Sequence, residues 1–471
     1  MLDLHSLVLG GGGAKGVVYP KTLQELHRDR QIDLRAVPHV AGASAGALTG
    51  FILALGGTPD AIAQLSPTIT EALPFATKSF ANRGETYIAA SRATTVFDYT
   101  ADKLDGSTIP SVLMIWAETA LLQLMRRIVE QIDLDDKGDS FLTLDGERYY
   151  LNELHGRGTG CFWDYDVDPG GPHIGALRAA LTTGLRDLRR FGCYLVSTHH
   201  RIVTLLREAG IDAGWKHLSV TLTRLYPAQV DSAALAETFG SLNYVSSLLP
   251  PGTWSSERNP VHKAFVRHEG VCLLAAAQAS GAFPLLFAAS TLGPSPSLRD
   301  FLYTDGGCMS NMPIEAPIFA DSIIGRPTAE RDILAIGLND GDEASSLPSW
   351  WQMSIVQRLM LPSAHKTIVV PANDSFYARA RRDICRTPPA AKTEHGALFR
   401  FSMKPEGDYR IFYASKLPDA PISLTAEIPT GTPGSSVQNA IDEYAGSIVR
   451  NLALLVQQAA PQRGGGIWGG L

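Results

Sequence analysis

Short apolar runs that end in glycine or in a polar turn recur along this chain. Leu7-Val8-Leu9 runs into four glycines, and His39-Val40-Ala41 runs into Gly42-Ala43-Ser44. Similar runs lie at residues 218–223, 302–305 and 333–338. Apolar, β-branched runs bounded by turn residues predict buried strands. Because helical patterns separate these runs, the chain is predicted to be an α/β protein, with helices on both faces of a mixed, mainly parallel sheet.

Helical spacing marks most of the intervening segments. Residues 47–55 predict a buried helix that ends at Gly56-Gly57. Apolar residues recur at three- and four-residue intervals from Ile109 to Leu134, which predicts a long helix. Its expected role is packing, with a lid or an acyl-chain channel as the alternative. Further helices are expected at 271–280 and 435–459, and short strands at 367–370 and 409–413.

Composition narrows the function classes. The net charge of -6 and 19% charged residues describe a globular chain without a basic surface, which argues against nucleic acid as a partner. The five cysteines are scattered and odd in number, so neither a disulfide framework nor a zinc site is predicted. No ligand spacing for a metal is visible around the histidines His173, His199 and His200 or the acidic turn of Asp133, Asp135, Asp136 and Asp139.

The sequence also predicts the type of membrane contact and the cellular location of the protein. Its first residues lack a basic segment ahead of an apolar one, and no apolar stretch approaches the roughly 20 residues that span a bilayer. We therefore expect peripheral membrane contact only. The expected location is the cytoplasm, or export without a Sec signal peptide.

The Gly-x-Ser-x-Gly stretch around Ser44 is the first candidate site. A strand that turns sharply into a helix places a serine at a strained elbow, and Gly42 and Gly46 supply the lack of bulk that this turn needs. The helix N-terminus would favour a developing oxyanion. An ordinary strand-to-helix turn with a capping serine is the alternative.

The glycine-rich loop at residues 10–16 is the second candidate. Gly11-x-Gly13-x-x-Gly16 formally fits a dinucleotide fingerprint, and Lys15 suggests a P-loop. The P-loop comparison fails because Gly16 and Val17 follow Lys15, where that motif needs Ser or Thr. Asp33 has nearly the spacing of a ribose-binding acid but does not end a clear strand.

Asp305-Gly306-Gly307 after a predicted strand completes three motifs whose order resembles the patatin-like phospholipase family. Residues 279–287 and 310–313 also resemble segments of that family. The resemblance covers residues 1 to about 60 and about 215 to 340. It implies a three-layer α/β/α sandwich with helical insertions.

The same resemblance implies a catalytic dyad without histidine, in which Ser44 attacks and Asp305 acts as the base. It assigns the oxyanion hole to Gly11, Gly12 and Gly13, with Gly12 and Gly13 as the first choices for donors and Gly11 close by. No metal or cofactor is implied. The motif-supporting residues are Lys15, Gly16, Gly42, Gly46, Gly306 and Gly307. Lys15 is interpreted either as a residue that anchors the loop or favours an anionic head group, or as a solvated lysine at a helix start.

The function expected from the resemblance is a serine lipid acyl hydrolase of the phospholipase A or lysophospholipase type, acting on membrane phospholipid or lysophospholipid. Two alternatives stay open. One is a lipid- or partner-binding effector of the same family whose hydrolysis needs a protein activator. The other is an α/β-hydrolase with a Ser-Asp-His triad, completed by a histidine such as His365 or His395.

The length of 471 residues exceeds a usual single domain. We expect a catalytic domain over residues 1–345 with a helical insertion at about 60–215. A C-terminal extension, residues 346–471, should pack on or extend that domain. Its Gly-rich tail, residues 464–471, is expected to be mobile.

Overall fold

The computed structural model describes residues 2–29, 31–63, 65, 109–128, 133–134, 136–138, 140–144, 146–150, 171–227, 241–252, 265–267, 270–282, 291–293, 301–325, 330–338, 389–393, 396–403, 407–415 and 436–459. Several predictions concern residues outside these ranges: the segment 283–287, the strand 367–370, the tail 464–471, His365 and His395.

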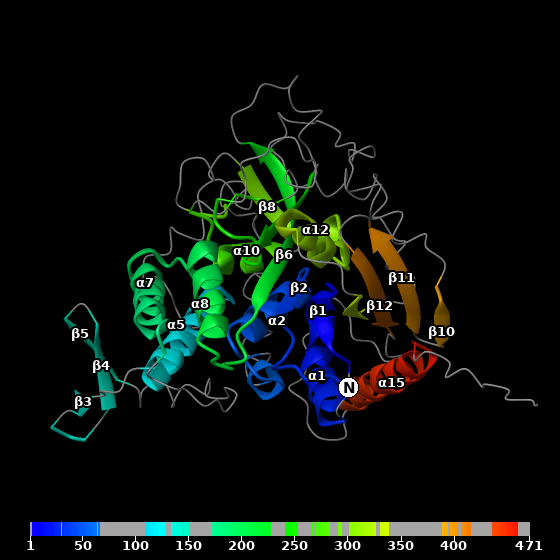
Figure 1. Ribbon diagram of the computed structural model, residues 1–471, viewed down its shortest axis with the longest axis horizontal. Helices are drawn as coiled ribbons and strands as arrows, with labels where there is room; N and C mark the ends of the chain where they lie inside the picture. The colour runs from blue at the N-terminus through cyan, green and yellow to red at the C-terminus, as the bar shows by residue number, and fades with distance from the viewer. Residues whose placement is uncertain are drawn as a thin grey trace, which may run out of the picture.

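Nine of the described strands form one mixed sheet, drawn at the centre and right of Figure 1. Its middle is parallel: β12, β9, β1, β2 and β6 lie side by side in that order. These strands are Gly407–Ser415, Arg331–Gly337, Leu4–Leu9, His39–Gly42 and His217–Pro227. Parallel strands are buried on both faces, which accounts for their nearly continuous apolar sequences.

Both edges of the sheet are antiparallel. At one edge β6 pairs with β7 (Ser241–Ser246) and β8 (Phe301–Asp305). At the other edge β12 pairs with β11 (Gly396–Met403), which pairs with β10 (Ala391–Thr393). The predicted strand 409–413 is thus confirmed as part of β12, and residues of the C-terminal extension continue the sheet of the N-terminal region. The domain boundary near residue 345 stays a prediction.

Alternation along the central strands divides the core into two apolar layers. Leu7 and Leu9 of β1 face one cluster, whereas Val8 between them faces the other. The first cluster packs against α1 (Tyr19–Arg28), α2 (Ala45–Ala54) and α15 (Ser436–Ala459). The second packs against α12 (Glu315–Ile324). Helices therefore cover both faces, and the predicted three-layer α/β/α class is confirmed.

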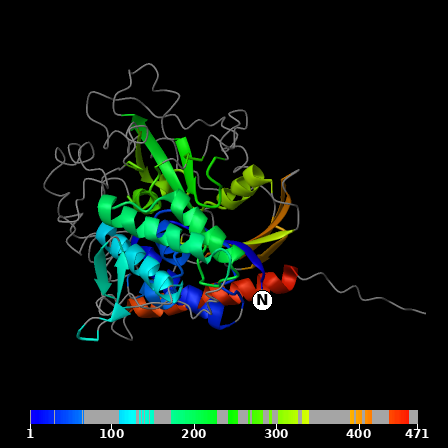
Figure 2. The same ribbon diagram turned by 60° about the vertical axis from the view of Figure 1, so that its left-hand side comes forward.

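The helical region beside β6 holds most of the predicted insertion that is described, and Figures 1 and 2 show it on the side of the sheet away from β11. Its helices are α5 (Ile109–Ile128), α7 (Ile174–Phe191), α8 (Val196–Glu208) and α10 (Leu273–Ser280). The helix predicted over 109–134 was too long, because Asp133–Leu134 form strand β3, paired with β4 (Ser140–Leu144). Strand β5 (Glu147–Tyr150) completes this small sheet. No helix among the described residues is long and apolar enough to cross a membrane.

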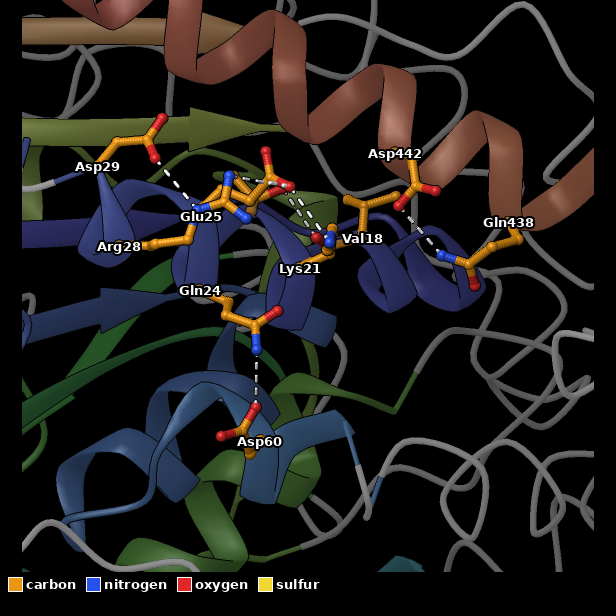
Figure 3. Close-up of polar contacts among 10 residues, drawn as sticks. Val18, Lys21, Gln24, Glu25, Arg28, Asp29, Asp60, Gln438 and Asp442 are labelled. Atoms are coloured by element: carbon orange, nitrogen blue, oxygen red, sulfur yellow. Dashed lines mark hydrogen bonds and ion pairs between the residues drawn. The ribbon is translucent and has the colours of Figure 1, made fainter. Parts of the chain in front are cut away.

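Helix α1, from the N-terminal part of the chain, packs against helix α15, from the C-terminal part, and Figure 3 shows α15 running over α1. On α1, Lys21 pairs with Glu25 at 3.2 Å one helical turn away, and Gln24 donates a hydrogen bond to Asp60 at 3.1 Å. Such exposed contacts contribute little to stability. The apolar face of α1, with Leu23 and Leu26 fully buried, therefore supplies most of its anchorage.

Candidate active site

The predicted elbow is present between β2 and α2. Ser44 caps α2 with φ 50° and ψ -122°, and it is the only non-glycine residue with a positive φ among the described residues. That conformation is costly for a side-chain-bearing residue and occurs where the surrounding structure holds it. A Cβ on Gly42 would lie 2.3 Å from the Gly46 carbonyl oxygen, and one on Gly46 would lie 2.2 Å from the Leu9 carbonyl oxygen. Both positions therefore require glycine.

The serine and the aspartate meet directly. Ser44 Oγ donates to Asp305 Oδ2 at 2.7 Å, although 261 positions separate the two residues. Their exposed fractions are 6% and 2%. Asp305 ends β8, and its Oδ1 accepts the Gly307 N–H at 2.7 Å within the short helix η5 (Gly306–Cys308). The structure thus brings together the two residues that the motifs predicted as nucleophile and base.

Burial changes the acidity of this carboxyl group. Burial raises the pKa of Asp305 to about 7, and the hydrogen bonds from Ser44 and Gly307 oppose that rise. A carboxylate with such a pKa is a far better proton acceptor near neutral pH than an exposed aspartate.

The backbone around Asp305 is held from two sides. Its carbonyl oxygen accepts the Thr223 hydroxyl of β6 at 2.8 Å, and its N–H donates to the Ala282 carbonyl at 3.1 Å. A Cβ on Gly306 would lie 2.1 Å from the Thr221 carbonyl oxygen, so the turn after Asp305 packs directly on β6. The side chain of Asp305 is consequently fixed toward the elbow.

The glycine-rich loop lies beside the elbow. A Cβ on Gly11 would lie 2.9 Å from the Ser44 Cβ, and one on Gly16 would lie 2.8 Å from the Ala45 Cβ. Gly13, with φ 56°, starts the short helix η1 (Gly13–Val18), which contains a half-buried Lys15. This proximity agrees with a loop that faces the reacting group.

The three predicted oxyanion donors are not equivalent. The Gly11 N–H donates to the Asn311 carbonyl at 2.9 Å, so it is already engaged, and its prediction as a donor needs correction. Within the described residues, the N–H groups of Gly12 and Gly13 have no hydrogen-bond partner. These two amides are the available donors of the loop.

Ser280 and Asn311 contact the site, although sequence analysis assigned a role to neither residue. Ser280 Oγ accepts the Ser44 N–H at 3.0 Å. Asn311 Nδ2 donates to the Gly11 carbonyl at 3.2 Å, while its own carbonyl accepts from Gly11. Both residues lie in segments that resemble the family, which is the only sequence signal that pointed toward them.

Among the described residues, no other ionisable side chain is hydrogen-bonded to this pair. No histidine is hydrogen-bonded to Ser44 or Asp305 there, and no cluster of potential metal ligands occurs there. His199 is buried and bonds Tyr194 and the Lys216 carbonyl, as expected of a structural histidine. The side chain of His173 is 39% exposed, and its Nδ1 lies 3.5 Å from Glu208 Oε2. Cys193 and Cys272 are free thiols.

A comparison with known proteins agrees with the α/β/α fold and the serine–aspartate site described above. A family model described as patatin-like phospholipase matches residues 7–141. The resemblance noted in the sequence is thereby confirmed over residues 7–141. That match includes the glycine-rich loop and the Ser44 elbow and ends before Asp305, so the place of Asp305 rests on the geometry above. No curated protein matched the chain.

Two solved structures show more distant similarity. The crystal structure of VipD from Legionella pneumophila has a TM-score of 0.41 and 16% identity, covering 96% of this chain and 67% of VipD. ExoU, solved in complex with SpcU from the type III secretion system of Pseudomonas aeruginosa, has a TM-score of 0.30 and 16% identity. That comparison covers 81% of this chain, which spans only about half of ExoU, 51%.

Proposed function

We propose that this protein is a serine lipid acyl hydrolase of the phospholipase A or lysophospholipase type, which uses Ser44 and Asp305 as its catalytic pair. The proposal rests on one observation: Ser44, at the strained elbow, donates a 2.7 Å hydrogen bond from its Oγ to the buried Asp305. The patatin-like family match supports lipid esters as the substrate class.

In the acylation step, Asp305 accepts the Ser44 proton while Ser44 Oγ attacks the ester carbonyl. The resulting oxyanion is stabilised by the N–H groups of Gly12 and Gly13. Asp305 then returns the proton to the departing alcohol. Its raised pKa suits both halves of this transfer, because an acid with a pKa of about 7 accepts and releases a proton readily near neutral pH.

In the deacylation step, Asp305 takes a proton from water while the water oxygen attacks the acyl carbonyl. The bond between Ser44 Oγ and the acyl group then breaks, Asp305 returns the proton to Ser44 Oγ, and the fatty acid leaves. Burial of both residues limits competing access of bulk water before substrate binds. Since Asp305 must be ionised to act as the base, activity should rise with pH through about 7.

The lipid would be reached by peripheral contact with a membrane surface, and the protein would act in the cytoplasm or after export without a Sec signal peptide. The alternative function is a lipid- or partner-binding effector whose hydrolysis requires a protein activator. The solved ExoU structure contains SpcU as a partner of ExoU; for this chain, the requirement for an activator stays a prediction.

The test is to incubate the purified protein with vesicles of defined phospholipids or with lysophospholipid micelles, with and without eukaryotic cell extract, and to identify released fatty acids. We expect release that Ser44→Ala abolishes and EDTA leaves unchanged. Activity only with extract would identify an activator-dependent enzyme. Absence of Ser44-dependent release under every condition would refute the proposal.

A further inference from the structure

The nucleophile is held by a contact that its own elbow does not contain. The N–H of Ser44 donates to Ser280 Oγ at 3.0 Å, and Ser280 is fully buried at the C-terminal end of α10. A buried backbone N–H that loses its acceptor destabilises the conformation that buries it. This amide also belongs to the only non-glycine residue with positive φ in the described chain, so losing its acceptor would remove a contact that holds a strained conformation.

The chain just after Ser280 holds the other member of the pair. The Ala282 carbonyl accepts the Asp305 N–H at 3.1 Å and the Thr304 hydroxyl at 2.7 Å. Residues 280–282 therefore contact the backbone of the nucleophile at one end and the end of β8 at the other. The three residues therefore form a bridge, made of hydrogen bonds, between the backbones of Ser44 and Asp305.

Packing makes this bridge stiff. Between Ser280 and Ala282, a Cβ on Gly281 would lie 3.3 Å from Leu48 Cδ1, so α2 packs closely against the turn. Side chains of α10 from Leu273 to Ala277 are buried throughout. A stiff support fixes a reacting pair more tightly than a loop does.

We propose that Ser280 is a positioning residue for the hydrolytic reaction: its hydroxyl oxygen fixes the backbone of Ser44 so that the nucleophile stays in hydrogen-bond contact with Asp305. This inference rests on the proposed function. It concerns residue geometry rather than substrate identity, and one of its tests needs no activity.

The test compares Ser280→Ala and Ser280→Thr with a matched control, Ser247→Ala. Ser247 is also fully buried, and its Oγ also accepts a backbone N–H, that of Leu218 at 2.9 Å. It lies beside the start of β6, away from the Ser44–Asp305 pair. The two alanine variants therefore remove the same type of bond and should lower the melting temperature by similar amounts.

We expect Ser280→Ala to reduce kcat by roughly 10- to 100-fold with little change in KM, as for a misplaced reacting group. Ser247→Ala should retain the wild-type kcat, and Ser280→Thr, which keeps a hydroxyl, should recover much of it. The acidic limb of the pH–rate profile should also move to higher pH in Ser280→Ala, because the Ser44 hydrogen bond lowers the Asp305 pKa. Equal kcat values and pH profiles in the two alanine variants would overturn the proposal.

Hydrogen exchange measured by mass spectrometry on the peptide containing Ser44 gives the result that does not depend on turnover. Faster exchange at the elbow in Ser280→Ala than in Ser247→Ala supports the contact, and unchanged exchange refutes it. If wild-type protein hydrolyses no lipid, the proposed function fails, while this exchange measurement still decides whether Ser280 holds the elbow.

Discussion

The two ends of the neighbouring strands β2 and β6 both bury ionisable groups but use them differently. At the start of the strands, His39 lies opposite His217, and Lys216 is fully buried with Nζ donating to the Gly214 carbonyl at 2.6 Å. Beyond the carboxyl end of β2 lies Ser44, and Asp305 lies opposite Leu222 in the middle of the longer strand β6.

Burial drives the groups at both ends toward the neutral form. It lowers the pKa of Lys216 to about 7 and raises the pKa of Asp305 to about 7. Only the carboxyl end adds a strained nucleophile and closely packed glycines. A shifted pKa therefore does not identify the candidate site by itself; the shift together with strain and a bonded nucleophile does.

The largest expected difference between the two ends is in catalysis. Ser44→Ala and Asp305→Asn should each lower kcat by about 10⁴-fold or more, because one loses the nucleophile and the other cannot accept its proton. His39→Gln, at the other end, keeps groups that can bond its neighbours Ser6 and Ser219 and should retain most activity. Fatty-acid release by the purified variants measures this. A double variant of Ser44 and Asp305 far less active than either single variant would contradict one catalytic unit.

The next largest effect should come from the glycine-rich loop. A Cβ on Gly12 would lie 2.6 Å from Leu338 Cδ1, so Gly12→Ala should shift the loop and its amides. Loss of one oxyanion donor typically lowers kcat by about 10²–10³-fold. Gly175→Ala, where an added Cβ meets nothing within 4 Å, is the control for glycine replacement. Turnover of Gly12→Ala equal to that of the control would indicate a packing role alone.

Stability should show the cost of the raised pKa of Asp305. The unfolded chain releases this proton near the ordinary aspartate pKa of 3.8 and the folded chain at about 7, so stability is lost as pH rises through that window. Asp305→Asn should therefore stabilise the protein on the order of 2 kcal/mol at pH 8, less than the ~4 kcal/mol equivalent to the shift, because its hydrogen bonds change. Chemical unfolding at pH 8 and pH 5 measures this. A gain that did not shrink at pH 5 would contradict the burial argument.

Lys216 should show the opposite pH dependence. Its pKa is about 7 in the folded chain against an ordinary lysine value of 10.5, so stability is lost as pH falls from about 10 to 7. Lys216→Met should be more stable than wild type at pH 7, by on the order of 1–2 kcal/mol after loss of the bond to Gly214. This gain in stability should diminish at pH 10. The kcat of Lys216→Met should equal that of the wild type. Unfolding midpoints at the two pH values test this, and a gain independent of pH would exclude Lys216 desolvation as its cause.

The smallest effect is expected from the histidines of the triad alternative. If Asp305 is the base, His365→Ala and His395→Ala should each retain most activity toward a small soluble ester, because neither carries the proton. Rates of ester hydrolysis by the two variants and by Asp305→Asn separate the mechanisms. A fall of orders of magnitude in one histidine variant, with activity kept by Asp305→Asn, would require a triad.

Local signals in the sequence identified the elbow, the glycine-rich loop and the class of fold. Gly42 and Gly46 were predictable because a tight turn requires small residues within a few positions of Ser44. The central strands were predictable because burial on both faces leaves continuous apolar runs. The end of the long helix was placed wrongly, since apolar spacing continued to Leu134 while backbone pairing drew Asp133–Leu134 into a strand.

The sequence by itself therefore determined which residue types stand at the turns and which segments bury themselves, because both depend on neighbours a few positions apart. The tertiary structure alone decided the contacts between those segments. It placed Asp305 against Ser44, a pairing that the sequence implied only through the family resemblance. It also used the Gly11 N–H to bind Asn311 and supplied Ser280 as the acceptor for the nucleophile's amide. Each of these bonds joins segments more than 200 positions apart, and its geometry depends on strand pairing and helix packing, which leave no local pattern in the chain.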